Sequence, residues 1–397
     1  MFGELYSWYL LNPEYRSRVQ KLVQSAFAGK PEDIISQSVA KALYGEVSPY
    51  SATRLERFAA CAFAHFLQYG MKLTERVEYE FKPMDMGNVM HEALESFAEE
   101  VRKRGMKWTE LTEQERNEIA DRCLDNIVAD YGNTVLKSSA RNEYMIERTR
   151  RILRRTVWAL QKQLEQGEFQ PEGFEVTFGG GRIDRVDIME DQNKVYVKVI
   201  DYKTGNTSFD LVYLYHGLQL QLMIYLDGAL RVEQKKYPDK EIIPAGVFYY
   251  NIKDPMIQEK IDADVEAVSA GLMKELKMNG LVQADPELVY RMDSSLGSIP
   301  VAFNKDGSFR KNSSVADRTQ FAVLGRYVRT KIEKIRSSIL EGDAEVSPYE
   351  LGKKNACTYC PYMTVCGFDR RLSGYEFRRL KNFSDEELWK AFDREAE

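Results

Sequence analysis

The sequence predicts an α/β fold in which a small central sheet lies between two helical regions. Two observations carry this prediction. Residues 174–205 form successive β-rich runs, separated by the turn residues EDQN at 190–193. Before about residue 158 and after about residue 262, the apolar residues instead recur at spacings of three and four, as they do in helices. The 397 residues are enough for one large domain or two ordinary ones.

The composition is that of a soluble globular protein, with 44% hydrophobic and 29% charged residues. No stretch approaches the roughly 18–20 apolar residues of a membrane span, and the N-terminus does not resemble a secretory signal. We therefore expect a cytoplasmic protein. A net charge of -5 argues against a protein that coats nucleic acid nonspecifically. This net charge does not exclude a DNA enzyme. A metal-dependent nuclease needs carboxylates, and its basic residues can be confined to one groove.

The helical segments can be placed from their apolar faces. One helix is expected to begin at Ser51, which can cap it, and to continue through Phe66. A second, over residues 87–101, carries His91 on its apolar face, directed toward the interior. Residues 1–45 are helix-forming, and we interpret them as the remnant of a larger preceding region. Further helices are expected over residues 214–230 and 321–340, and a further strand over residues 244–255.

Five arginines crowd two helical turns of the segment RNEYMIERTRRILRR (Arg148, Arg150, Arg151, Arg154 and Arg155). They fit either a basic groove for nucleic acid or an ordinary solvated helix face. The sequence leaves both interpretations open.

An acid and a base share one face of the strand VYVKVIDYK. Period-two alternation places Asp201 and Lys203 on the face that also carries Val195, Val197 and Val199. If the preceding strand forms a hairpin that turns at Gln192 and Asn193, Asp184 lies opposite Asp201. Directly opposed side chains have Cβ atoms about 4.5–5.5 Å apart, and two like charges at that distance need a cation between them. The spacing therefore predicts a metal site.

Carboxylate oxygens favour Mg²⁺ or Mn²⁺ over zinc. Such an ion polarises a phosphate and lowers the pKa of a bound water. Lys203 can hold that water or neutralise the charge that develops on the phosphate. His91 can supply a neutral imidazole to the same ion, although a lone histidine on an apolar face is more often a core residue. His65 and His216 have no comparable context.

Four segments, in order, are GNVMHE, GRIDRVD, IDYKTG and LQLQLMIY. Together they resemble the RecB-type branch of the PD-(D/E)XK nucleases. The resemblance implies a restriction-endonuclease-like core, with a mixed sheet flanked by helices and helical insertions. It assigns His91, Asp184 and Asp201 to metal binding and Lys203 to catalysis. It also assigns Gln221 and Tyr225 to a helix that lines the site, with Gln219 as the alternative to Gln221.

The cysteines form a second candidate site. Cys357, Cys360 and Cys366 lie close together near the C-terminus, and Cys61 can complete a set of four thiolate ligands. Spacing alone allows zinc or an iron–sulfur cluster. The family resemblance implies a 4Fe–4S cluster, an iron–sulfur staple between distant parts of the chain. The alternative is zinc held by the three C-terminal cysteines and another ligand. Cys123 is left over and is expected to be structural.

Longer segments narrow the resemblance. SATRLERFAACAFAHFLQYGMKL, PAGVFYYNIKDP, KELKMNGLV and CTYCPYMTVCGFD resemble the C-terminal nuclease domain of the AddB family of helicase–nuclease subunits. This resemblance implies an exonuclease that acts on single-stranded DNA at broken ends during recombinational repair, beside an AddA-type subunit. The expected plan is a helical remnant followed by one nuclease domain. The ranges are 1–45 for the remnant and 46–397 for the domain, divided into a helical part (46–170), the catalytic core (171–260), an insertion with helices (261–345), the cysteine cluster (346–370) and a tail (371–397).

Two alternatives remain. One is a free-standing exonuclease of the CRISPR-associated or Dna2-like kind, which also combines such a core with cysteines. The long insert between Pro255 and Ser347, which resembles AddB in places, weighs against it. The other is a DNA-binding or scaffolding module whose catalytic site is idle. The presence of Asp184, Asp201 and Lys203 argues against that class.

Overall fold

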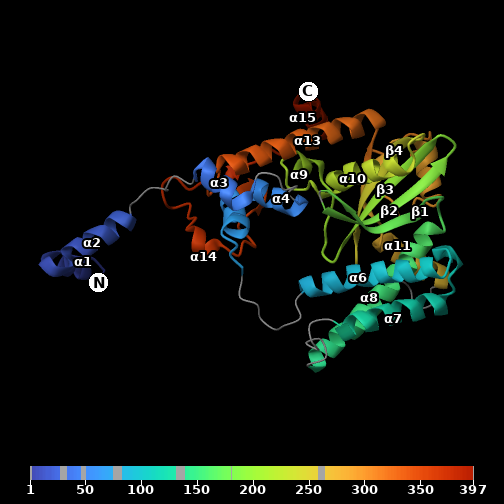
Figure 1. Ribbon diagram of the computed structural model, residues 1–397, viewed down its shortest axis with the longest axis horizontal. Coiled ribbons are helices and arrows are strands. Elements are labelled where there is room, and N and C mark those ends of the chain that lie inside the picture. The colour runs from blue at the N-terminus through green and yellow to red at the C-terminus, as the bar shows by residue number, and fades with distance from the viewer. Residues whose placement is uncertain are drawn as a thin grey trace. The chain divides into compact units, whose positions relative to one another are not determined.

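A six-stranded mixed sheet, with its strands in sequence order, forms the core of one compact unit of the computed structural model (Figure 1). The strands are β1 (Gln170–Phe178), β2 (Gly181–Asp191), β3 (Lys194–Lys203), β4 (Glu241–Asn251), β5 (Asn279–Gln283) and β6 (Val315–Ala316). The pairs β3–β4 and β5–β6 are parallel, and the other neighbours are antiparallel. The predicted fold class, a mixed central sheet flanked by helices, is confirmed.

The structure describes residues 2–26, 34–45, 51–74, 83–130, 139–179, 181–257 and 264–396. The chain divides into two compact units, each assembled from separate stretches of sequence. The first comprises Met1–Ser48, Arg57–Glu75 and Lys334–Asn382. The second, which contains the six-stranded sheet, comprises Pro49–Glu56, Arg76–Glu333 and Phe383–Glu397.

Helices pack on the sheet of the second unit. Helix α10 (Gln221–Lys236) lies against β2, β3 and β4. Helices α6 (Pro83–Lys103), α7 (Glu113–Asp130) and α8 (Ala140–Leu164) lie next to one another beside the sheet (Figure 1). They share the main hydrophobic core with sheet residues such as Tyr202 and Phe248. The remaining helices that lie wholly in this unit are η2 (Trp108–Glu110), α9 (Leu211–Tyr215), α11 (Val265–Glu275), α12 (Pro286–Met292) and α15 (Asp385–Ala396).

Three sequence expectations about secondary structure were wrong. The helix expected over residues 214–230 is not continuous, because α9 ends at Tyr215 and α10 begins at Gln221. Only helices were expected after residue 262, but β5 and β6 lie there. A five-residue strand such as NGLVQ, with two apolar side chains, is too short to show a period. The helix expected from Ser51 to Phe66 is interrupted. Helix α4 (Ala52–Ala60) ends at Cys61, whose backbone is extended (φ -166°), and α5 (Ala62–His65) and a π-helical turn, η1 (Phe66–Gly70), follow.

The first unit contains four of the five cysteines. It contains α1 (Phe2–Leu11), α2 (Pro13–Ala26), α3 (Gln37–Tyr44), α14 (Met363–Cys366) and a small sheet in the order β8-β7-β9 (Lys354–Asn355, Tyr349–Leu351 and Arg378–Arg379). Helix α13 (Arg318–Glu341) begins in the second unit and ends in the first. Cys61, Ala64, Leu67 and Tyr362 form a small buried apolar cluster.

Three of the five clustered arginines of α8 form ion pairs. Arg150 pairs with Asp121, Asp125 and Glu147. Arg154 pairs with Asp121, and Arg151 pairs with Asp254 at 2.6 Å. These contacts favour the ordinary helix face over a basic groove, because a guanidinium that neutralises a carboxylate is not available to a phosphate.

A buried ionic cluster lies within the sheet on the side of the main core. The Arg185 guanidinium contacts Asp187 at 2.5 and 2.9 Å, and Lys198 Nζ lies 3.0 Å from the same carboxylate. The three side chains are 7% exposed or less. The rings of Trp108 and Phe174 face the Arg185 guanidinium.

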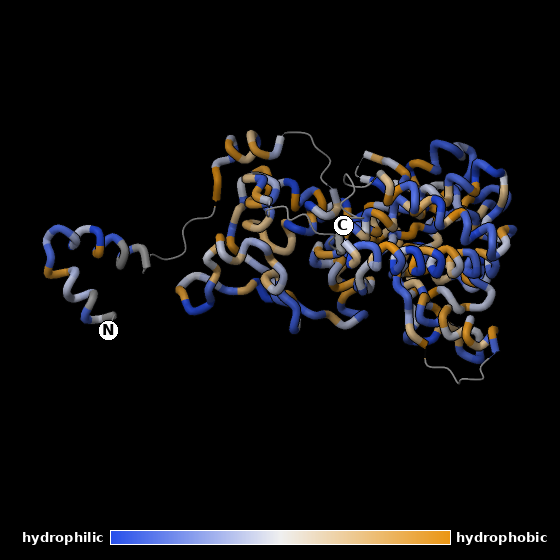
Figure 2. The backbone as a smooth tube through the Cα atoms, turned by 90° about the horizontal axis from the view of Figure 1, so that it is seen from below, coloured by the Kyte–Doolittle hydropathy of each residue, from blue (hydrophilic) through white to orange (hydrophobic). Residues whose placement is uncertain are grey.

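Hydrophobic and hydrophilic residues alternate in short stretches along the chain (Figure 2). Among the described residues, the structure contains no helix with the length and apolar character that a membrane crossing requires.

Candidate active site

The β2–β3 hairpin brings two carboxylates to one end of the sheet. Its pairing runs from Asp191 opposite Lys194 to Arg185 opposite Ile200, around the turn at Gln192 and Asn193. One further step in this register sets Asp184 opposite Asp201. The register that the two-residue turn predicted is therefore the register of the structure. Both carboxylates are buried, with residue exposures of 8% for Asp184 and 1% for Asp201.

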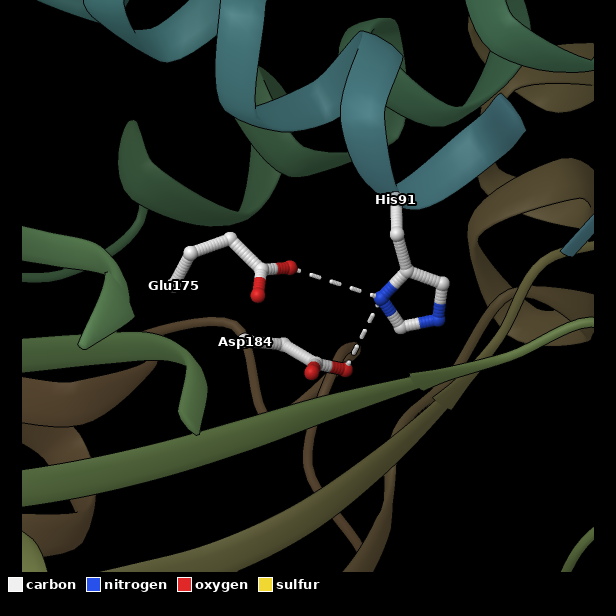
Figure 3. A group of neighbouring side chains, drawn as sticks. All are labelled: His91, Glu175 and Asp184. Atoms are coloured by element: carbon white, nitrogen blue, oxygen red, sulfur yellow. Dashed lines mark ion pairs between the residues drawn. The ribbon is translucent and has the colours of Figure 1, made fainter. Parts of the chain in front are cut away.

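His91 approaches this pair from α6 (Figure 3). Its Nδ1 lies 3.3 Å from Oδ2 of Asp184, and its Nε2 lies 3.1 Å from the carbonyl oxygen of Tyr202. The Tyr202 amide in turn donates to Asp184 Oδ2 at 2.7 Å. These contacts orient the imidazole and the Asp184 carboxylate toward each other.

Glu175 is a member of the site that the sequence did not reveal. His91, Glu175 and Asp184 each offer a ligand atom, and these atoms all lie within 4.8 Å of one another (Figure 3). Glu175 Oε1 is 3.7 Å from His91 Nδ1, and Arg182 pairs with the same carboxylate. The available signal was an acid between Phe174 and Val176 in β1. The register of β1 against β2 was needed to place it beside Asp184, and the glycine-rich connection between those strands does not specify that register.

The backbone of Glu175 adopts φ 49°, in the left-handed region that a non-glycine residue rarely occupies. A bulge between Pro171 and Gly173 precedes it on the same strand. Such a conformation costs about 1–3 kcal/mol and persists where the surrounding structure imposes it. Here the strained residue is the one whose carboxylate faces His91.

Lys203 is held from two sides. Its Nζ lies 2.6 Å from Asp201 Oδ2 and donates to Gln221 Oε1 at 2.8 Å. The amide of Gln221 donates to the hydroxyl of Tyr225 at 2.9 Å, one turn further along α10. The ring of Tyr249 also faces the ammonium group, at 5.4 Å.

The structure distinguishes the two glutamines left open by the sequence. Gln219 Oε1 accepts from the Asp210 amide, and its Nε2 donates to the Ser208 carbonyl oxygen, so it links two parts of the preceding loop. Gln221, in contrast, contacts Lys203 directly. Of the two, Gln221 is the one that faces the candidate site.

The electrostatics fit a cation among these groups. Burial, and then the charge of Asp201, raises the pKa of Asp184 to about 7. Burial also raises the pKa of Asp201, against the opposing effect of Lys203. Burial alone would lower the pKa of His91, but the carboxylates of Glu175, Asp184 and Asp201 outweigh it and raise that pKa. A divalent cation would relieve the repulsion between the carboxylates, and the donor set of carboxylate oxygens and one imidazole suits Mg²⁺ or Mn²⁺.

The four cysteines predicted to act together line one small cavity in the first unit, and each is a free thiol. Burial, followed by the neighbouring Cys61, Cys360 and Cys366, raises the pKa of Cys357 to about 12. Burial also raises the pKa of Cys61. In this apolar cavity, the ionisation of one thiol disfavours that of its neighbours, and a metal ion bound by the sulfurs would stabilise the thiolate form. Cys123 lies apart from them, in the main hydrophobic core.

Comparison with known proteins identifies the family of the chain. The model of the PD-(D/E)XK nuclease superfamily matches residues 49–367. The chain is 41% identical over its full length to an ATP-dependent helicase/deoxyribonuclease subunit of Lachnoclostridium phytofermentans. It is 34% identical, over 99–100% of its length, to proteins of the same name from Thermoanaerobacter sp. and Alkaliphilus metalliredigens. It spans 36–37% of the length of these relatives. The chain therefore belongs to the PD-(D/E)XK nuclease superfamily.

Proposed function

We propose that this chain is the nuclease domain of a helicase–nuclease and hydrolyses phosphodiester bonds of single-stranded DNA, with Mg²⁺ or Mn²⁺ at Asp184, Asp201 and His91. One observation carries the proposal. Three carboxylates and an imidazole from four separate elements converge beside a lysine that is itself held by an acid and an amide. An idle scaffold would have no need to maintain this concentration of buried charge, because each buried carboxylate lowers the stability of the fold.

Each residue of the site has a role in this proposal. Asp184 and Asp201 supply oxygen ligands, His91 supplies a nitrogen ligand, and Glu175 is added as a carboxylate within reach of the same ion. The bound ion would act as a Lewis acid on the phosphate. Lys203 Nζ, held between Asp201 and Gln221, orients the attacking water or neutralises charge that develops on the phosphate. Gln221 and Tyr225 keep the lysine in place from α10.

The four cysteines are proposed to hold a 4Fe–4S cluster through Cys61, Cys357, Cys360 and Cys366. The shared cavity and the free thiols support this assignment. When bound, the cluster would link residues about 300 positions apart in the sequence. The thiols lie in the first unit and the carboxylates in the second, so the cluster is assigned to folding rather than to hydrolysis.

The names of the relatives support a proposal for the substrate and the partner. Each is named as one subunit of an ATP-dependent helicase/deoxyribonuclease, which implies a second subunit and DNA as the substrate. We propose an AddA-type helicase–nuclease subunit as that partner and single-stranded DNA at double-strand breaks as the substrate. Exonucleolytic cleavage during recombinational repair is part of the same proposal.

The test is cleavage of end-labelled single-stranded DNA by the purified chain, with Mg²⁺, Mn²⁺, Ca²⁺ or excess EDTA. We expect cleavage with Mg²⁺ and Mn²⁺ and little with Ca²⁺, which binds oxygen ligands in looser geometry. A circularised strand of the same sequence separates exonuclease from endonuclease action. Full activity after exhaustive chelation, or inactivity with every metal, would overturn the proposed function.

A further inference from the structure

Glu56, on α4, accepts hydrogen bonds from the start of α10, more than 160 residues later. Its Oε1 receives the backbone N–H of Leu220 at 2.7 Å and that of Gln221 at 3.0 Å. Leu220 is the N-cap residue of α10 and cannot supply a capping side chain itself. A carboxylate at this position satisfies two backbone donors that a helix start leaves unpaired, and it faces the positive end of the helix dipole.

The first residue of the helix that Glu56 caps is Gln221, and this residue contacts Lys203. The contacts form a continuous path, from Glu56 to the Gln221 backbone and then from the Gln221 side chain to Lys203 Nζ at 2.8 Å. Lys203 Nζ continues the path to Asp201 at 2.6 Å. A change in how the helix begins would therefore shift the amide oxygen that holds the lysine.

The capping carboxylate is retained at an energetic cost. Burial raises the pKa of Glu56 to about 7, although the two backbone N–H groups and the nearby Lys203 oppose that shift. A neutral Ser, Thr or Asn at the N-cap itself would satisfy a helix end at lower cost. The carboxylate instead comes from a separate helix, which ties α4 to the helix that carries Gln221 and Tyr225.

We propose that Glu56 is a positioning residue for Lys203, which it holds in place through the first turn of α10 and the side chain of Gln221. This inference rests on the proposed function, since Lys203 is the group that it serves. Glu56 itself is not asked to contact the metal or the DNA.

The first experiment compares steady-state cleavage by Glu56→Ala, Glu56→Gln and Glu233→Ala. Glu233 is a matched control, because its buried carboxylate is on the same helix as Gln221 but in the last turns, where it pairs with Lys236 at 2.9 Å. We expect Glu56→Ala to lower kcat by roughly 10- to 100-fold with KM for DNA nearly unchanged, as a small misplacement of a catalytic group does. Glu56→Gln keeps the acceptor oxygen and should recover most of kcat. Glu233→Ala should keep kcat.

A double-mutant cycle tests the path. Once Gln221→Ala has removed the contact to Lys203, adding Glu56→Ala should cause almost no further loss of kcat. Two outcomes would overturn the proposal. One is a double variant whose loss of kcat equals the product of the two single losses. The other is a Glu56→Ala variant with the same kcat as Glu233→Ala. If Glu56→Ala does not fold, Glu56→Asp replaces it. The shorter side chain keeps the charge but withdraws the oxygen, so its kcat should fall well below that of Glu56→Gln.

A readout that needs no cleavage separates this inference from the proposed function. Lys203 can be acetylated with acetic anhydride and its labelling rate followed by mass spectrometry, relative to Lys194 at the other end of β3. Glu56→Ala should label faster at Lys203 than wild type, whereas Glu56→Gln and Glu233→Ala should not. An unchanged rate in Glu56→Ala refutes the positioning role even if the wild type cuts DNA. Failure of the wild type to cut DNA counts against the proposed function alone.

Discussion

His91 Nδ1 lies 3.3 Å from Asp184 Oδ2, although the two residues belong to a helix and a strand that are far apart in sequence. The contact joins α6 to the end of the β2–β3 hairpin. It also makes the protonation of each group dependent on the other, because the carboxylate favours imidazolium and the imidazolium favours carboxylate. A divalent ion at this position would displace the imidazole proton, so its affinity should rise with pH.

Lys203→Ala and Asp201→Ala should each lower kcat by at least about 100-fold, the scale seen when one group that stabilises transition-state charge is removed. Lys194→Ala, an exposed lysine at the other end of the same strand, is the control and should cut normally. DNA affinity measured in Ca²⁺ should be nearly unchanged. A Lys203→Ala variant that cuts at near wild-type rate would exclude the catalytic role of this lysine.

Glu175→Gln should weaken the affinity for Mn²⁺ by about 10–100-fold, because it removes a charge from the ligand set and leaves the shape of the side chain unchanged. The matched variant is Glu172→Gln on the same strand, where the carboxylate pairs with Lys236 on the surface. Isothermal titration with Mn²⁺ gives both affinities. Equal affinities in the two variants would show that Glu175 is not a ligand.

Asp184→Asn should stabilise the metal-free protein at pH 8. The folded-state pKa of Asp184 is about 7, above the ordinary value of 3.8, so folding disfavours its ionised form. Its contribution to stability is fully present below 3.8 and is lost as the pH rises through about 7. Asparagine stays neutral at every pH. The variant should therefore gain stability relative to wild type as the pH rises through this range, by at least about 1 kcal/mol, or about 2–4 °C in Tm.

Thermal melts in EDTA at pH 4 and pH 8 check this expectation. Asp191→Asn, at the other end of β2, provides the comparison, since its carboxylate is partly exposed and pairs with Arg291. A variant Asp184→Asn that is less stable than wild type at pH 8 would contradict the assigned direction of the pKa shift.

Cys61→Ser and Cys366→Ser should give poorly soluble, protease-sensitive protein. A cluster between them closes a very long loop, and such a link removes several kcal/mol of freedom from the unfolded chain. The anaerobically purified wild-type protein should show a broad absorption band at roughly 400 nm, from iron–thiolate charge transfer. Cys123→Ser should leave the solubility and the protease resistance of the protein nearly unchanged. Because Cys123 is buried in the core, Cys123→Ala is a further control that avoids a buried hydroxyl. Stoichiometric zinc without iron in such a preparation would exclude the cluster but not the nuclease.

Asp187→Ala should destabilise the fold by about 3–5 kcal/mol, because it leaves Arg185 and Lys198 buried without their partner. Glu190→Ala, on the same strand but paired with Lys240 at the surface, should cost less than about 1 kcal/mol. Denaturant unfolding of both variants measures the difference. Equal losses would mean that the buried cluster contributes no more than a surface pair.

The sequence by itself determined the parts of the site that depend on local geometry. A two-residue turn and the period-two alternation of strands set Asp184 opposite Asp201 and placed Lys203 on the same face, and the structure has this register. The apolar face of the helix over residues 87–101 directed His91 inward, as it is in α6. These features follow from neighbours in the chain, so they can be read without knowing the remainder of the fold.

The tertiary structure alone decided which distant groups join them. The register of β1 brings Glu175 to the site. Glu56 reaches it through its contact with the start of α10. The position where that helix begins decides that Gln221, rather than Gln219, contacts Lys203. The short strand β5 was missed from the sequence for a related reason, since it is recognisable only by its pairing with β4 and β6. Long-range packing and pairing leave no period in the sequence, because the residues that meet are specified by separate segments whose relative placement arises only on folding.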